Sequence, residues 1–263
     1  RHQQVSVRGF SGPSNNKLLV LIDGRTVFSD TYGMVFWDAF PVSLAEIDRI
    51  EFVKSPSSSI YGANAFTGVI NIITKTPEKL NGTTIHLSLG DEGTLIGTFL
   101  HGGKTKNDKF HYKVSAEVDR TQEWVDRNNS RSTATRYNGL MQYRFSPETD
   151  LTVSLGRGYS RNRRLYRPGE DLGNVDDIND YIQADFKTGS LQFRFFYKGN
   201  RTGNEDPSEG ECVQWPAQTY NWEVFQTLHP FKNHNLIWGV NFRYNRVKDN
   251  PTFDGDHDQA LWA

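Results

Sequence analysis

The residue types that carry out chemistry are present in this chain, but their spacing fits no catalytic arrangement. The stretch Ser55–Gly68 is rich in Ser and Gly, as are loops whose backbone N–H groups cradle phosphates. It lacks the Gly-Lys-Ser/Thr ending of a phosphate loop, and the β-branched run Val69–Thr74 follows it instead of a helix. The histidines stand singly, and no nucleophile, base and orienting group are grouped in the sequence. We therefore predict that the protein is not an enzyme and has no cofactor.

The sequence also contains no clear metal-binding motif. Carboxylates gather in the segment 202–217, and oxygen ligands of this kind suit calcium. Nothing in their spacing fixes a ligand set, so no metal site is predicted. Cys212 is the single cysteine, which excludes an internal disulfide framework and a zinc cluster built from cysteines. The carboxylates are Glu205, Asp206, Glu209 and Glu211.

The strongest candidate binding surface is the segment Arg25–Phe40, which follows an apolar strand and the turn pair Asp23-Gly24. It is rich in aromatic side chains, and long loops of this kind on a rigid scaffold are typical binding surfaces. The alternative is that Phe36, Trp37 and Phe40 only pack against a neighbouring element. The predicted ligand-binding residues are Phe28, Ser29, Asp30, Tyr32, Met34, Phe36 and Trp37.

Two further groups of charged residues stand out. Arg8, Arg49, Glu51 and Lys54 lie in or beside segments that otherwise read as buried strands, and buried charges need partners. The segment 160–167 is strongly basic, and we predict that it attracts anionic ligands, although a solvated charged loop is the commoner role of such a run. Its arginines are Arg161, Arg163, Arg164 and Arg167.

The composition indicates which elements position these residues. The 263 residues carry a net charge of −1, so no global field favours nucleic acid. Hydrophobic content is low at 36%, while 13% of residues are aromatic and Gly is frequent, which suits a β-rich chain with many turns. No apolar run approaches the ~18 residues that a membrane-spanning helix needs. A membrane β-barrel remains compatible, because its strands alternate and keep the mean hydropathy low.

Residues 1–80 predict a small α+β domain. They contain short, continuously apolar β runs, such as Leu18–Ile22 and Val69–Ile73, which are typical of strands buried on both faces. One helical patch, Pro41–Asp48, interrupts them. Ser43 is expected to cap it, and Glu46 completes a capping box.

Residues 81–263 predict antiparallel strands with one apolar and one polar face. In Phe110–Val118 the apolar residues occupy every second position, and His111, Lys113 and other polar residues lie between them. Most predicted strands are long enough to cross a bilayer when tilted, ~10 residues. The nine predicted strands cover 83–90, 94–102, 109–120, 134–145, 150–159, 179–187, 190–201, 218–229 and 234–247.

The connections between these strands alternate in length, which favours a transmembrane barrel. Short links at 146–150, 188–189 and 230–233 alternate with long polar segments at 121–133, 160–178 and 202–217. Membrane barrels have short periplasmic turns and long outer loops. Aromatic residues near strand ends suit the girdle of a membrane interface, or ordinary sheet packing. They are Trp124, Tyr143, Phe145, Trp222 and Trp238.

Four ordered segments within residues 5–76 resemble the plug domain of TonB-dependent outer-membrane receptors. The segments are Val5–Phe10, Val20–Arg25, Ile47–Pro56 and Ile60–Lys75. Residues 83–247 are similar to the barrel of this family in pattern only. One departure is Lys54-Ser55-Pro56, where the family usually has Arg-Gly-Pro, so a bidentate pairing at this position is lost.

The resemblance implies a receptor in the outer membrane of a Gram-negative bacterium that imports a scarce nutrient. A ferric siderophore is the first candidate, with cobalamin, haem or a glycan as alternatives. It also implies partners: the TonB–ExbB–ExbD complex, which displaces the plug, and the lipid bilayer with its lipopolysaccharide. Nucleic acid is not among them. In this interpretation the segment 25–40 is the outward apex of the plug.

Other roles also follow from the resemblance. The charged set around Arg49 would join plug to barrel, or form salt bridges inside the plug. The family barrel has about 22 strands, so the nine predicted here suggest an internal piece of a receptor or an incomplete gene product. A passive porin and a soluble carbohydrate-binding β-protein remain as rival interpretations.

Overall fold

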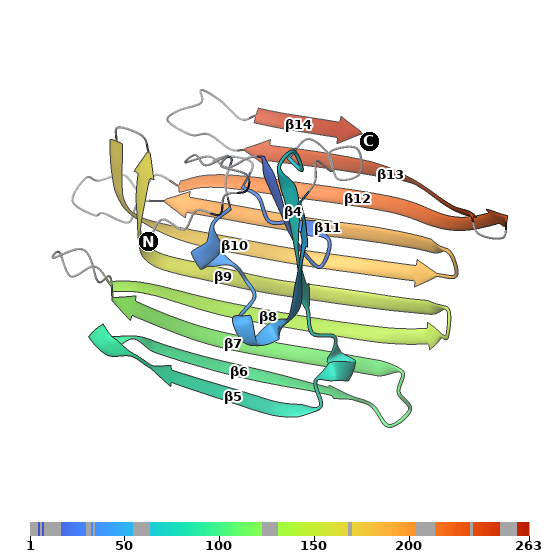
Figure 1. Cartoon of the computed structure of the whole chain (residues 1–263), viewed down its shortest axis with the longest axis horizontal. Coiled ribbons are helices and arrows are strands. Elements are labelled where there is room, and N and C mark those ends of the chain that lie inside the picture. The colour runs from blue at the N-terminus through green and yellow to red at the C-terminus, as the bar shows by residue number, and fades with distance from the viewer. Residues whose placement is uncertain are drawn as a thin grey trace.

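The computed structural model consists of two β-sheets, and the smaller one lies in front of the larger one in Figure 1. The structure describes residues 5, 7, 17–29, 33, 35–54, 64–122, 131–167, 170–203, 214–231, 234–247 and 257–262. Within these, the side chains of 92, 122, 131, 162–167, 170–175, 214–215 and 257–262 are not described.

The small sheet has the strand order β2-β1-β4-β3. Its strands are β1 (Leu18–Ile22), β2 (Arg25–Thr26), β3 (Ile47–Val53) and β4 (Gly68–Thr74). β1 pairs in parallel with β4, which explains why both strands are mainly apolar. Alternate residues of β1 enter the core of this domain, and its buried members are Leu18, Val20, Ile22, Phe40, Val42 and Ile72.

Two local predictions for this domain need correction. The patch Pro41–Asp48 forms a single 3-10 turn, η2 (Leu44–Glu46), because β3 begins directly after it. The predicted capping box is confirmed, since the Ser43 backbone N–H donates to Glu46 Oε1 at 3.1 Å. β3 was predicted to be buried but is an exposed edge strand, with Ile50 59% exposed. An apolar run does not reveal whether a strand lies at the centre or the edge of a sheet.

The large sheet is an antiparallel meander in which each strand pairs with its neighbours in sequence, and ten strands are described, from β5 to β14. The nine predicted strands are confirmed as β5–β13, and β14 is an additional strand. The bounds are β5 (Gly82–Leu89), β6 (Leu95–Lys104), β7 (Phe110–Gln122), β8 (Arg131–Ser146), β9 (Thr149–Arg167), β10 (Glu170–Thr188), β11 (Leu191–Gly203), β12 (Gln214–Phe231), β13 (His234–Val247) and β14 (His257–Trp262).

The predicted long loop 160–178 is wrong, because β9 and β10 continue as a paired hairpin to Arg167 and Glu170. The other connections named in the prediction keep the predicted asymmetry. At one end of the sheet, called here the short-turn end, residues 147–148, 189–190 and 232–233 join strands. At the opposite end, called the loop end, the connections include 123–130, 204–213 and 248–256. Three short 3-10 turns, η1 (Trp37–Ala39), η3 (Pro77–Lys79) and η4 (Asp91–Gly93), lie in the connections.

The large sheet buries its polar side chains and exposes its apolar ones. Along β7, His111, Lys113 and Glu117 are buried, whereas Val114 is 44% exposed. The same inversion holds on the neighbouring strands, which bury Asn138, Gln183 and Asn200. The exposed apolar residues include Ile85, Leu87, Phe99, Met141, Leu155, Ile182, Phe193, Trp222, Trp238 and Val240. This pattern is typical of a sheet whose outer face meets lipid.

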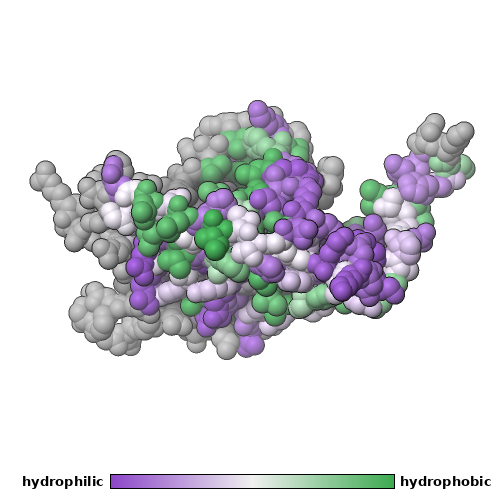
Figure 2. Space-filling view, turned by 90° about the horizontal axis from the view of Figure 1, so that it is seen from below, coloured by the Kyte–Doolittle hydropathy of each residue, from purple (hydrophilic) through white to green (hydrophobic). Residues whose placement is uncertain are grey.

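The small domain covers the polar face of the large sheet. η1 packs against β8, β9 and β10, and η2 against β6. Figure 2 views the molecule from the β5 edge, where hydrophobic side chains lie open at the surface, and the small domain rises from one face only. In the described part of the chain, no helix has the length and apolar character required to span a membrane.

Candidate functional site at the interface of the two sheets

Arg25 of the small domain forms the first of three buried attachments to the large sheet. The turn Asp23-Gly24 positions it: both turn residues have positive φ, 49° and 83°, the conformation that Asp-Gly favours in tight hairpins. Arg25 is only 2% exposed. Its Nη1 donates to Gln183 Oε1 at 3.2 Å, and its guanidinium lies 3.4 Å from the ring centroid of Tyr181. A cation–π contact in a water-excluded site is among the stronger of its kind.

Glu46 forms a second buried attachment. Besides capping η2, its Oε2 accepts a hydrogen bond from Asn138 Nδ2 at 2.6 Å. The Oδ1 atom of Asn138 accepts in turn from the hydroxyl of Tyr181. Arg25 and Glu46 are therefore connected through two side chains of the large sheet, Tyr181 on β10 and Asn138 on β8.

Lys113 of β7 provides the third attachment. Its Nζ donates to Thr74 Oγ1 and to the carbonyl of Lys75, both at 2.8 Å. The Thr74 hydroxyl donates to Asp23 Oδ2 at 2.9 Å, and its backbone N–H donates to Asp23 Oδ1 at 2.8 Å. The end of β4 and the Asp23-Gly24 turn are thus held by one lysine of the large sheet.

The three attachments balance their charge. Two cations, Arg25 and Lys113, face two carboxylates, Asp23 and Glu46, so this set is formally neutral. Removing one member of such a buried set leaves an uncompensated charge, which is strongly destabilising. A polar, hydrogen-bonded interface can also separate into water at a smaller cost than an apolar one, because its groups are solvated after separation. The arrangement is suited to docking that is firm and reversible.

Side chains of the large sheet also hold the segment 25–40 by its backbone. Lys198 donates to the carbonyl of Phe28, Arg136 Nη2 to that of Asp38 at 3.1 Å, and Asn179 Nδ2 to that of Ala39 at 3.0 Å. These bonds depend on the path of the chain and not on its side chains. They fix the segment against β8, β10 and β11.

The predicted ligand-binding residues differ in their exposure. Phe28, Ser29 and Phe36 are buried, at 7%, 3% and 4% exposed, so they pack inside the protein in this structure. Trp37 is half-buried and its ring packs on Phe40, with centroids 5.0 Å apart. Asp30, Tyr32 and Met34 lie outside the described residues.

Two members of the predicted charge set form a salt bridge inside the small domain, which was one of the two predicted roles of the set. Arg49 Nε pairs with Glu51 Oε1 at 2.8 Å on the exposed strand β3, within the small sheet. The hydrogen bond from Arg49, followed by that from Asn71, lowers the pKa of the Glu51 carboxyl. Lys54 lies over the ring of Phe52 at 5.9 Å, and Arg8 lies outside the described residues. Arg25, Glu46 and Lys113 are among the charged residues that do contact the facing sheet. Lys113 had a signal in the sequence, as a lysine on the polar face of an alternating strand.

The predicted basic outer loop belongs to strand β9. Arg161, Arg163, Arg164 and Arg167 all lie in its paired region, since alternation and pairing with β10 continue beyond residue 160. Among their side chains only that of Arg161 is described. It points to the outer face, where its Nε donates to the Tyr159 hydroxyl at 2.9 Å. The acidic segment around Glu209 and Cys212 lies outside the described residues. In the described part of the chain, no group of His, Cys, Asp and Glu side chains is arranged to hold a metal.

A further group of ion pairs fixes η3, which leads from the small domain into β5. Lys79 Nζ lies 2.7 Å from Asp48 Oδ2, and Glu78 Oε1 lies 3.2 Å from Arg144 Nη2 at the short-turn end. The hydrogen bond from Lys79 is the main cause that lowers the pKa of Asp48. Nearby, Asp108 in the β6–β7 turn has its pKa lowered chiefly by the hydrogen bond from Lys104.

Comparison with known proteins places these features among described families. Residues 1–69 match the family model of the TonB-dependent Receptor Plug Domain. The ferric enterobactin receptor PirA of Pseudomonas aeruginosa is 31% identical over 215 residues, which cover 70% of this chain and 28% of that protein. The vitamin B12 transporter BtuB of Vibrio cholerae is 42% identical over 79 residues, which cover 30% of this chain and 13% of the transporter. The chain thus spans less than a third of the length of these relatives.

The fold is shared with solved structures. The crystal structure of a mutant of the ferric enterobactin receptor PfeA from Pseudomonas aeruginosa superimposes with a TM-score of 0.75 and 16% identity. The match covers 99% of this chain and 48% of that one. Both sheets described above are therefore included in the shared fold.

Proposed function

We propose that this chain, a plug domain and adjoining barrel strands of the TonB-dependent receptor type, serves to import a scarce nutrient across the outer membrane. The observation that carries the proposal is the inverted burial of the large sheet together with a plug docked on its polar face. A plug fixed by Arg25, Lys113, Asp23 and Glu46 blocks passage along that face. Transport then requires that these contacts open, which is work for an energy-coupling partner.

The nutrient class is proposed to be a ferric siderophore. The similarity to the vitamin B12 transporter is confined to 79 residues, whereas the similarity to the ferric enterobactin receptor extends over 70% of the chain. The longer match includes barrel strands as well as the plug. Among the predicted ligand contacts that the structure describes, Trp37 is the one that retains exposed surface. We assign it to ligand binding, together with the predicted contacts Asp30, Tyr32 and Met34.

The partners follow from the same proposal. The TonB–ExbB–ExbD complex supplies the force that opens the interface, and the surrounding medium of the large sheet is the outer membrane. No covalent chemistry is required of the protein. A passive porin is disfavoured by the docked plug, and a soluble carbohydrate-binding protein by the exposed apolar face.

A reversible tether between the two sheets tests the proposal. Cys212 is replaced by Ser, and cysteines are introduced at Ala39 in η1 and Asn179 in β10, whose groups are hydrogen bonded at 3.0 Å. A short bis-maleimide containing a reducible bond then joins them. We expect cells to bind an iron-labelled siderophore but not to accumulate it until the tether is reduced. Accumulation that continues through the intact tether, or that does not depend on TonB, contradicts the proposal.

A further inference from the structure

The inner face of the large sheet carries a row of residues that lie directly opposite one another on neighbouring strands. Each member pairs in register with the next, from β6 to β11. The members have polar side chains, except for one glycine near the middle. We call this set the cross-sheet row, and it consists of Thr98, Glu117, Arg136, Gly158, Asn179 and Asn200.

Hydrogen bonds join the polar members on each side of the glycine. On one side, Glu117 accepts from Thr98 Oγ1 at 2.7 Å and from Arg136 Nη1 at 2.6 Å. On the other side, Asn200 Nδ2 donates to Asn179 Oδ1 at 2.6 Å. The Arg136–Glu117 ion pair is nearly enclosed, since the two side chains are 11% and 8% exposed. Arg136 and Asn179, the neighbours of the glycine, are therefore both held in fixed directions.

Gly158 forms a notch in the row that a side chain would fill. A Cβ at this position would lie 2.2 Å from the Ala39 carbonyl oxygen and 2.8 Å from the Phe40 carbonyl carbon. Both are backbone atoms, which cannot move aside as the end of a flexible side chain can. Gly158 does not have positive φ, so the position requires a small residue and not an unusual backbone conformation.

The notch receives η1, and the residues beside it bind the end of this turn. Arg136 Nη2 donates to the Asp38 carbonyl at 3.1 Å, and Asn179 Nδ2 donates to the Ala39 carbonyl at 3.0 Å. Side-chain donors, and cations above all, suit the last carbonyls of a helical turn. Three consecutive members of the row therefore determine where η1 lies on the wall.

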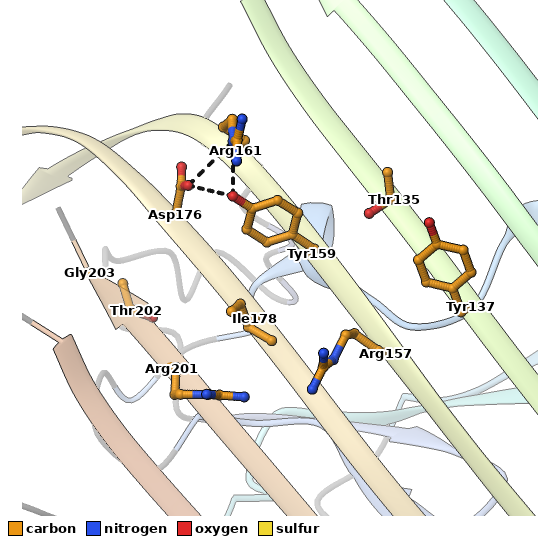
Figure 3. Close-up of a pocket in the computed structure, with 10 residues that line it drawn as sticks. All are labelled: Thr135, Tyr137, Arg157, Tyr159, Arg161, Asp176, Ile178, Arg201, Thr202 and Gly203. Atoms are coloured by element: carbon orange, nitrogen blue, oxygen red, sulfur yellow. Dashed lines mark hydrogen bonds and ion pairs between the residues drawn. The ribbon is translucent and has the colours of Figure 1, made fainter. Parts of the chain in front are cut away.

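The opposite face of the same strands shows that the row is directed at the small domain. Successive residues of a strand point to opposite faces of the sheet. Arg136, Gly158 and Asn179 therefore point toward η1, while the residues next to row members line a cavity on the outer face. Figure 3 shows these neighbours, which include Tyr137, Arg157, Tyr159, Ile178 and Arg201.

η1 contains Trp37, the described member of the predicted ligand contacts that retains exposed surface. Its ring packs on Phe40 with centroids 5.0 Å apart, while Phe36 and Ala39 are buried, at 4% and 0% exposed. The indole therefore has little freedom to move independently of η1. A shift of η1 on the wall moves the ring with it.

We propose that the cross-sheet row positions Trp37 for ligand capture, an inference that deepens the proposed function and rests on it. Arg136, oriented by Glu117, and Gly158 act as positioning residues. They fix η1, and Trp37 contacts the ferric siderophore. The barrel wall thus contributes to affinity through residues that do not touch the ligand, and affinity depends on the space at Gly158.

Filling the notch tests the inference on the purified full protein, with ferric enterobactin as the probe. Gly158→Ala displaces η1. We expect binding to weaken about tenfold, because a charge-assisted hydrogen bond to η1 is lost and part of the population no longer has Trp37 in place. Gly139→Ala is the matched control on β8, where a Cβ meets nothing within 4 Å, and it should bind normally. Normal binding by Gly158→Ala overturns the inference.

Arg136→Lys tests the second positioning residue. It keeps a charge beside Glu117 but loses the planar fork that also reaches the Asp38 carbonyl. We expect it to weaken binding as well, and normal binding excludes Arg136 from the positioning role. The heat-dependent gel shift of the folded barrel verifies that each variant is assembled.

A double-mutant cycle separates a role through Trp37 from general disruption. In the Trp37→Ala background, Gly158→Ala should weaken binding by less than about twofold, because the contact that it displaces is already absent. An undiminished effect of Gly158→Ala in that background overturns the inference.

A second measurement needs no ligand. Fluorinated tryptophan is incorporated, and the Trp37 resonance is assigned with Trp37→Phe. In the ligand-free protein Gly158→Ala should shift this resonance and Gly139→Ala should not, and an unmoved resonance overturns the inference. If the resonance moves but the unsubstituted protein neither binds nor accumulates the probe, the positioning of Trp37 is supported and the proposed nutrient is wrong.

Discussion

At the scale of single residues, the docking of the plug depends on side chains that are satisfied by two partners at once. Asn138 is the clearest, because it donates to Glu46 and accepts from Tyr181. Asn138→Asp replaces the donor with a carboxylate facing Glu46 at a distance where the wild-type bond measures 2.6 Å. We expect the plug to be destabilised by about 3 kcal/mol, the order found for uncompensated buried charges. Hydrogen exchange of the β1 amides measures this loss.

A compensating substitution separates this effect from general disruption. Glu46→Gln supplies an amide donor to the new carboxylate, so the double variant should recover most of the protection lost in Asn138→Asp. If the losses of β1 protection in the two single variants simply add in the double variant, the assigned contact between residues 46 and 138 is contradicted.

Two substitutions of Arg25 separate the contribution of its charge from that of its planar guanidinium group. Arg25→Met removes a buried cation, and we expect β1 to lose about 2 kcal/mol of protection, because Gln183 Oε1 loses its hydrogen-bond donor and the Tyr181 ring loses its cation. Arg25→Lys keeps the charge but loses the planar contact with Tyr181, and we expect about half that loss. Arg49→Gln, on the exposed strand β3, is the control and should change β1 protection little. Equal losses in all three variants would show that the interface contact is not responsible.

At the scale of elements, the turn η3 connects the plug to the large sheet, and its attachment should depend on pH. The pKa of Asp48 is lowered from its usual 3.8 chiefly by Lys79, so this carboxylate stabilises the folded protein above that value. Its contribution is lost as the pH falls below 3.8 through the lowered pKa. Asp108, lowered mainly by Lys104, behaves in the same way. We therefore expect amide exchange of η3 to accelerate, relative to its intrinsic rate, as the pH falls below 3.8.

Lys79→Gln is the matched variant for this pH dependence. It removes the main cause of the Asp48 shift, so η3 should exchange faster at neutral pH and respond less to acid. Because the Lys79–Asp48 pair is exposed, added salt should screen it and should also accelerate exchange of η3 at neutral pH. If exchange of η3 in Lys79→Gln accelerates in acid as much as in the unsubstituted protein, a group other than Asp48 causes the pH dependence.

The elements were largely predictable from the sequence, whereas the partners of the charges were not. Period-two alternation gives β5–β13 because each face meets one kind of environment. The hairpin beyond Ser160 was missed, since a run of arginines resembles a solvated loop until its pairing with β10 is known. Glu46 was recognised as a capping residue, but its second oxygen contacts Asn138, 92 residues away. Likewise, Arg49 and Glu51 satisfy each other locally, and only the fold shows that Arg25 reaches the large sheet.

At the scale of the whole molecule, the inverted burial of the large sheet makes a prediction that the two faces of one strand can test. Met141 and Gln142 are neighbours on β8: Met141 lies on the outer face and is 47% exposed, whereas Gln142 lies on the polar face, opposite His111 and Thr152. If the outer face meets lipid, Met141→Arg carries a penalty of about 2–4 kcal/mol near the bilayer centre and less near its borders. Gln142→Arg places the same side chain on the polar side, where no lipid penalty applies.

The fraction of each variant that assembles in the outer membrane, measured by the heat-dependent shift of the folded barrel on a gel, distinguishes the two. We expect Met141→Arg to reduce it clearly and Gln142→Arg to leave it near the unsubstituted level. In a water-soluble protein with an exposed sheet, the outward substitution would be harmless, because a surface arginine is solvated. The inward one, beside buried polar groups, would then be the more damaging. The order of the two variants, and not the size of either effect, therefore decides whether this sheet is solvated by lipid or by water.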